Sequence, residues 1–227
     1  MNGSVFVFVE LARTIARLSL LCMFVAFAAY TVAYVVLLVR FRLPAWTTAA
    51  AFREGKGQPW FRLLTFCQAC AFVTPLFFVA WVAALDASAA PRYETLTHLA
   101  LSAAVAFAVL SSVYYFVQFA LAGAGATGPG GAALTQLAQL NPASVFAAVN
   151  ILGWTLFFAV ASLCLAPLFL GGGAGTSVLA GLLLLNGGVC LVGVAGYLGH
   201  VRALSVIFFN GMGLAVLGFS LAGLLVS

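Results

Sequence analysis

Two cysteines separated by two residues, Cys67 and Cys70, are the residues of this chain best spaced for redox chemistry. A thiol–disulfide enzyme needs an accessible thiolate, and membrane enzymes of that kind also need further cysteines in loops to relay the disulfide. The other three cysteines, at positions 22, 164 and 190, lie in apolar stretches like the first two. We therefore interpret Cys67 and Cys70 as packing residues, and keep a membrane-embedded enzyme acting on lipid or quinone/thiol substrates as the alternative.

Haem sites and many metal sites use histidine ligands, and the chain has two histidines, His98 and His200. A zinc site needs three or four ligands, and a haem held by two histidines needs both at the same depth. The two histidines fall at opposite ends of the helices predicted below. We therefore predict no metal, no cofactor and no catalytic residue, and expect a protein that is not an enzyme.

The charge content of the chain indicates where it resides. Of the 227 residues, 65% are apolar or aromatic and 6% are charged, whereas a soluble domain has about 25% charged residues. The sequence therefore predicts an integral membrane protein, for which we expect no nucleic-acid partner. Because no acid or base lies well inside an apolar stretch, a transporter that depends on buried carboxylates is not expected.

Six stretches are apolar enough to cross a bilayer, which takes about 20 residues of helix. They cover residues 18–39, 63–85, 97–122, 144–170, 177–199 and 203–226. Residues 1–17 carry Glu10, Arg13 and Arg17 as a polar stripe, which favours an interfacial amphipathic helix; a long tilted first span is the alternative. The predicted fold class is all-α, a polytopic membrane protein whose single transmembrane domain covers residues 1–227.

The basic residues predict the orientation. Positive charge favours the cytoplasmic side, and six of the nine basic residues fall on the side of the 40–62 loop. We therefore predict an inner-membrane protein with loop 40–62 in the cytoplasm and both termini outside. Five basic residues in or next to this loop either mark topology alone or also contact lipid headgroups or a partner: Arg40, Arg42, Arg53, Lys56 and Arg62.

Uncharged polar residues gather in the cytoplasmic halves of the predicted spans. The candidate ligand-binding residues are Gln68, Tyr114, Tyr115, Gln118, Asn150, Asn210 and His200. They either form hydrogen bonds between helices, as Asn186 and Asn210 could across the last hairpin, or line a polar pocket. The predicted function is non-catalytic: the protein binds or passes a small or amphipathic molecule through this region, or is a membrane subunit of a larger complex.

Small residues four apart occur in several of the predicted spans, as in Ala104/Ala108 and Gly218/Ala222. Such pairs let helix backbones approach closely in lipid, where the hydrophobic drive between helices is weak. The expected partners are therefore membrane lipids, with other membrane subunits or further copies of this chain as possible additional ones.

Overall fold

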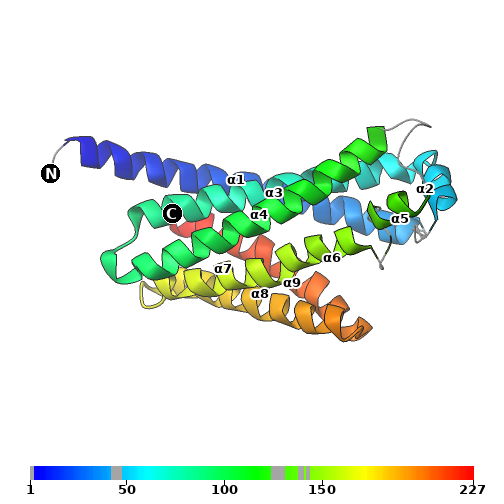
Figure 1. Ribbon diagram of the computed structural model, residues 1–227. Coiled ribbons are helices and arrows are strands. Elements are labelled where there is room, and N and C mark those ends of the chain that lie inside the picture. The colour runs from blue at the N-terminus through cyan, green and yellow to red at the C-terminus, as the bar shows by residue number, and fades with distance from the viewer. Residues whose placement is uncertain (1–2, 42–47, 124–130, 138–140, 142–143) are drawn as a thin grey trace.

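The structure is a computed structural model that describes residues 3–41, 48–123, 131–137, 141 and 144–227. Six long helical segments run through it (Figure 1). They are α1 (Gly3–Arg40), α3 (Trp60–Ser88), α4 (Glu94–Gly123), a composite fourth segment, α8 (Ala174–Leu198) and α9 (Arg202–Val226). All six are long and apolar enough to cross a membrane, so the predicted all-α fold with six spans is confirmed. The protein is a multi-pass integral membrane protein.

The fourth segment changes helix type along its length. It consists of α6 (Val145–Leu152), the π-helical η2 (Gly153–Phe157), α7 (Phe158–Leu165) and the 3₁₀ turn η3 (Ala166–Phe169). Three short elements lie between the long helices: α2 (Ala49–Lys56), η1 (Pro91–Tyr93) and α5 (Gly131–Leu137). Helices α2 and α5 lie together at the same end of the bundle, away from η1 (Figure 1).

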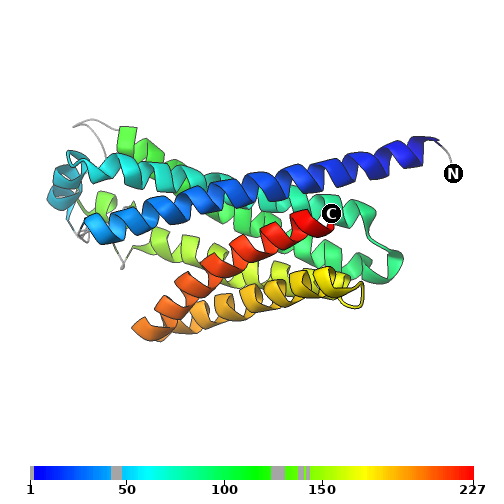
Figure 2. The ribbon, with the colours of Figure 1, turned by 180° about the vertical axis from the view of Figure 1, so that it is seen from behind.

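The first helix decides between the two interpretations of residues 1–17. Helix α1 continues without a break from Gly3 to Arg40, so the described part of this segment is not a separate interfacial helix. At 1.5 Å per residue its 38 residues measure about 57 Å, longer than the hydrocarbon core. Its N-terminal end extends beyond the other helices (Figures 1 and 2). The structure thus has the long first helix that was the alternative.

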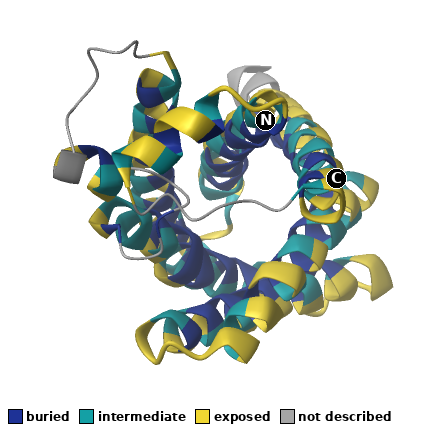
Figure 3. Ribbon diagram, turned by 90° about the vertical axis from the view of Figure 1, so that its right-hand side faces the viewer, coloured by how far each residue is buried: buried dark blue, intermediate teal, exposed yellow. Residues whose placement is uncertain are grey.

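The helices form a bundle, seen end-on in Figure 3. Within it α1 packs on α3, α3 on α4, and α4 on the fourth segment. Helices α8 and α9 form a hairpin whose close approach depends on glycine. A Cβ atom on Gly196 would lie 2.9 Å from the backbone nitrogen of Ser205, and one on Gly193 would lie 2.6 Å from the Phe208 ring. Both distances are too short for any larger residue, so these small residues set the spacing of the hairpin.

Aromatic side chains fill the centre of the bundle. Phe78 of α3 lies 4.9 Å, centroid to centroid, from Phe158, and Phe158 lies 4.8 Å from Phe107 of α4. Trp81 stacks on Phe219 of α9 with centroids 5.8 Å apart. This cluster joins α3, α4, α7 and α9 in one apolar core, and each edge-to-face or offset pair adds about 0.5–1.5 kcal/mol beyond simple burial.

A buried polar contact joins the fourth segment to α8. The Asn186 Nδ2 atom donates to the Ser162 hydroxyl at 2.8 Å, and both residues are fully buried. Asn210 does not pair with Asn186 as the sequence had allowed. It is exposed, and its Nδ2 atom donates to the Val206 carbonyl one turn earlier in α9. The last hairpin is therefore held by glycine contacts, while Asn186 links α8 to a different helix.

Candidate ligand-binding cavity

A cavity of about 240 Å³ lies between α1, α3, α4, α9 and the α6–η2 part of the fourth segment. It lies in the half of the bundle nearer to α2 and α5, since it begins four residues after the start of α3 and six after the start of α9. The lining residues are Phe27, Tyr30, Tyr34, Leu64, Cys67, Gln68, Ala71, Tyr114, Tyr115, Ala147, Asn150, Ile151, Trp154, Phe208, Phe209 and Met212.

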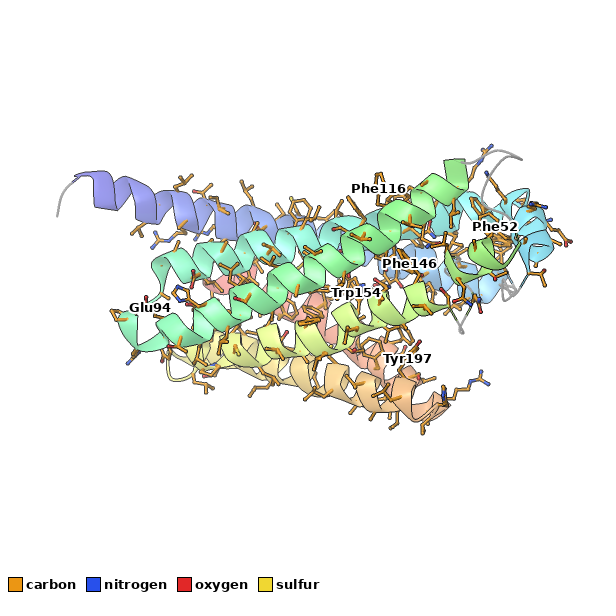
Figure 4. All side chains as sticks on the ribbon, in the orientation of Figure 1. Phe52, Glu94, Phe116, Phe146, Trp154 and Tyr197 are labelled. Carbon is orange, nitrogen blue, oxygen red and sulfur yellow. The ribbon has the colours of Figure 1, made fainter. Side chains whose placement is uncertain are left out.

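Aromatic rings make up half of these sixteen lining residues. Tyr30 and Tyr34 of α1 stack with centroids 5.6 Å apart, and Phe27 lies 6.4 Å from Trp154 on the facing segment. Figure 4 shows Trp154 midway between the two ends of the bundle. Among the described lining residues there is no Asp, Glu, Lys, Arg or His. The cavity is therefore apolar and aromatic, with a few uncharged polar groups.

Two of those polar groups are buried without a hydrogen-bond partner. The Oδ1 atom of Asn150 accepts no hydrogen bond and the Nε1 atom of Trp154 donates none, as far as the described residues go. Asn150 is 8% exposed and Trp154 is 6% exposed. Both side chains lie close to the Tyr115 hydroxyl, but neither of these two atoms forms a hydrogen bond with it by distance and angle. A buried acceptor and a buried donor without partners each cost about 1–3 kcal/mol, so the site offers two unused hydrogen bonds next to each other.

The π-helical segment η2 carries Trp154. Its wider turn is closed by the Phe158 N–H, which donates to the Gly153 carbonyl five residues earlier. Asn150 and Trp154, on either side of the start of η2, both line the cavity, whereas Phe158 after it packs in the core. On the other side of η2, Gly153 lies against α4, where an added Cβ atom would be 3.3 Å from the Ser111 hydroxyl oxygen. Single π-helical turns of this kind are frequent at functional sites.

The structure brings together four of the seven candidate ligand-binding residues. Gln68, Tyr114, Tyr115 and Asn150 all line the cavity. They come from α3, α4 and α6, and they meet because each lies at a similar depth along its helix.

The other three candidates lie elsewhere. Gln118 is buried, and its Nε2 atom donates to the Leu137 carbonyl at 2.7 Å, which ties α4 to α5. Asn210 is exposed on α9, as described above. His200 is exposed in the α8–α9 turn, where its backbone has a φ of 53°. Similar depth alone did not separate these residues from the lining ones, because depth does not say which way a side chain faces.

Sequence reasoning missed several lining residues, above all Trp154, Tyr30 and Phe208. One signal for Trp154 was present, because it lies four residues after Asn150 and so falls on the same face of a helix. Phe208 has no comparable polar neighbour in its sequence. It reaches the cavity because it packs on Gly193 of α8.

The residues considered for metal or redox chemistry are spread through the bundle. Cys67 lines the cavity and Cys70 does not, and both are free thiols. His98 lies 3.5 Å from the Asp86 carboxylate at the η1 end of the bundle, whereas His200 is in a turn at the opposite end. No group of three potential metal ligands occurs among the residues that the structure describes.

The basic residues of the 40–62 region lie near α2. Arg40 ends α1, Arg53 is exposed on α2, and Arg62 is exposed in the first turn of α3. Lys56 ends α2 and is half-buried. Arg42 lies outside the described residues. The structure thus gathers the described members of this group at one end of the bundle, near α5.

Comparison with known proteins returned no match. No protein-family model matches the chain, and neither a curated protein nor a solved structure is significantly similar to it.

Proposed function

We propose that this membrane protein binds a small, uncharged, amphipathic molecule that carries a hydroxyl group in the cavity around Asn150 and Trp154. The observation that supports it best is the pair of buried, unpartnered groups, the Asn150 carbonyl oxygen and the Trp154 indole N–H. Buried polar groups in folded proteins nearly always have partners. An acceptor and a donor side by side on a cavity wall therefore favour a ligand that supplies both.

A hydroxyl group fits these two atoms. It donates to the Asn150 Oδ1 atom and accepts from the Trp154 Nε1 atom, so one small group satisfies both. The aromatic rings around it favour an apolar body on the ligand, since rings pack well on aliphatic and planar groups. A charged ligand is disfavoured, because the described lining has no countercharge and a bare charge in a low-dielectric site is costly. A cavity of about 240 Å³ suits a small molecule, or the polar end of a longer one.

The test uses the purified protein in lipid nanodiscs and a long-chain alcohol that carries a photoactivatable diazirine near its hydroxyl. Irradiation should attach the probe to cavity residues, and peptide mapping by mass spectrometry identifies them. Dodecanol should compete with the probe, whereas dodecane, which lacks the hydroxyl, should not. Equal competition by the two would show that the hydroxyl is not recognised and would overturn the proposal.

Two variants separate ligand binding from helix packing. Asn150→Leu should weaken probe binding by up to about tenfold, the value of one hydrogen bond, and should leave thermal stability unchanged or higher because it removes a buried unpaired oxygen. Asn186→Leu is the matched control, since it breaks the bond to Ser162. It should lower stability and leave probe binding intact. Probe binding by Asn150→Leu equal to that of the unaltered protein counts against the site.

A second candidate function, as a membrane subunit or homo-oligomer, is favoured by one face of α8. Gly181 and Gly188 are exposed there, and no described atom lies within 4 Å of a Cβ atom placed on either. Exposed glycines in lipid permit another helix to approach closely. Native mass spectrometry from nanodiscs should then detect a complex that Gly188→Leu disrupts. A monomer in both forms would exclude self-association.

A further inference from the structure

We propose that the cavity is reached sideways from the lipid, through an opening between α1 and α9, and that Phe209 forms the rim of this opening. The inference rests on the proposed function and concerns the route by which the ligand arrives. Two observations point to it: the contacts between α1 and α9 stop at one edge of the cavity, and the end of the bundle nearest the cavity is closed by side chains.

Helices α1 and α9 meet in one part of their length and separate in another. They are close where a Cβ atom on Gly223 would lie 2.9 Å from Leu20, and in ordinary contact at 3.8 Å where Gly213 faces Phe27. Figure 2 shows the two helices diverging toward the N-terminal end of α9, with α6 visible between them. The cavity lies in this diverging part, since its lining includes Tyr34 of α1 and Phe208 of α9.

The lining on this side reaches the outer surface of the bundle. Phe209 lines the cavity and is also 49% exposed. Tyr30 and Tyr34, which line the cavity from α1, are only half-buried. A residue that is both part of a cavity wall and exposed on the lipid-facing side of a span marks a place where the cavity meets the bilayer.

Exposed apolar residues lie along both helices near this opening. Val35 of α1 is 51% exposed, and Val206 of α9 is 52% exposed. These positions belong to predicted spans confirmed as long apolar helices. An opening framed by such residues adjoins hydrocarbon and admits the apolar body of an amphipathic molecule.

The end of the bundle next to the cavity is closed by a second apolar cluster. Phe52 of α2 and Leu134 of α5 are buried there against Leu37, Trp60 and Leu64. Phe52 is 6% exposed and Leu134 is 4% exposed, and Figure 4 shows Phe52 at that end. A ligand coming from water at this end would have to pass through the cluster, so the side opening is the more direct route.

The test measures which quencher reaches Trp154. A variant with Trp46, Trp60 and Trp81 replaced by Phe keeps Trp154 as its single tryptophan. It is placed in nanodiscs made of phosphatidylcholine with or without bromine on the acyl chains. Bromine quenches indole fluorescence only near contact, so a lateral opening predicts a clear loss of Trp154 emission in brominated lipid. Acrylamide in the water should cause little loss. The opposite pattern, with acrylamide effective and brominated lipid not, would overturn the lateral route.

A matched pair on α9 identifies the rim. Phe209→Ala should increase quenching by brominated lipid, because it removes the ring at the opening. Ile207→Ala changes an equally exposed residue that does not line the cavity, and it should leave quenching unchanged. Equal effects of the two substitutions would show that Phe209 is not the rim.

A second measurement covers the case in which the single-tryptophan variant does not fold. The unaltered protein is irradiated in nanodiscs containing a phospholipid with a diazirine on its acyl chain, and the attachment sites are mapped. Labels on Tyr34, Phe209 and the inner wall at Ile151 support the opening, and labels confined to outward-facing residues overturn it. Failure of the alcohol probe to bind would refute the proposed ligand site, whereas these lipid measurements report on the opening alone.

Discussion

Gly193 connects the packing of the last hairpin to the shape of the cavity, and Gly193→Ala tests that connection. An added Cβ atom would lie 2.6 Å and 2.7 Å from two carbons of the Phe208 ring and 3.0 Å from the Thr155 methyl group. Ordinary carbon–carbon contacts are about 3.5–4.0 Å. The ring must therefore move by about 1 Å. Because Phe208 is 2% exposed and lines the cavity, the cavity is the space into which it can move.

The size of the effect follows from two opposing terms. Overpacking of this kind costs about 1–3 kcal/mol, while replacing a helical glycine by alanine gains up to about 1 kcal/mol. Gly188→Ala on the same helix is the matched control, since no described atom lies within 4 Å of its added Cβ atom. The helix-propensity gain is common to both variants, so Gly193→Ala should be less stable than Gly188→Ala by about 1–3 kcal/mol.

The assay combines unfolding and binding. Stability is measured by titrating the protein in mixed micelles with a denaturing detergent, and binding with the diazirine alcohol in nanodiscs. Gly193→Ala should bind the probe about tenfold more weakly, equivalent to about 1.4 kcal/mol, and Gly188→Ala should bind it normally. If the two variants have the same stability, the close contact between Gly193 of α8 and the Phe208 ring is refuted. If only binding is unchanged, Phe208 does not shape the ligand site.

Three further predictions concern packing and topology. A double-mutant cycle of Asn186→Ala and Ser162→Ala should give a coupling energy of about 0.6 kcal/mol in unfolding titrations, and a coupling of zero would contradict the bond between them. Gly196→Ala should lower stability by about 3 kcal/mol, at the upper end of overpacking costs, because its Cβ atom would meet backbone atoms of α9; unaltered stability would argue against the hairpin geometry. Cysteines introduced at Gln58 and Ala90 should react with an impermeant maleimide from opposite sides of the membrane, the first from the cytoplasm, and labelling from the same side would refute the predicted topology.

The six spans could be predicted from the sequence because each depends on a local property, a run of about 20 apolar residues. The separate interfacial helix predicted for residues 1–17 did not rest on a property of this kind. Glu10 and Arg13 form an ion pair on the helix surface at 2.8 Å, and the helix carries these charges without ending. The polar residues on one face of this helix therefore did not indicate whether the helix ends near residue 17 or continues into the first span.

The candidate site was predicted in part. Depth along each helix follows from the sequence, and it brought Gln68, Tyr115 and Asn150 into one set. The rotation of each helix about its own axis does not follow from the sequence. This rotation places Asn150 on the cavity wall and leaves Asn210 exposed. The π-helical turn at Gly153–Phe157 could not be predicted either, because the sequence there contains no proline or charged residue that would indicate it.

The absence of ionised side chains from the described cavity wall has an electrical consequence. A charge that crosses a membrane field exchanges about 2.3 kcal/mol per 100 mV with it, so a charged site or a charged ligand would make occupancy depend on voltage. An uncharged molecule that enters and leaves a wall of rings and amides moves no charge. Loading and release should therefore proceed equally in energised and de-energised membranes, governed by the amount of the molecule dissolved in the surrounding bilayer.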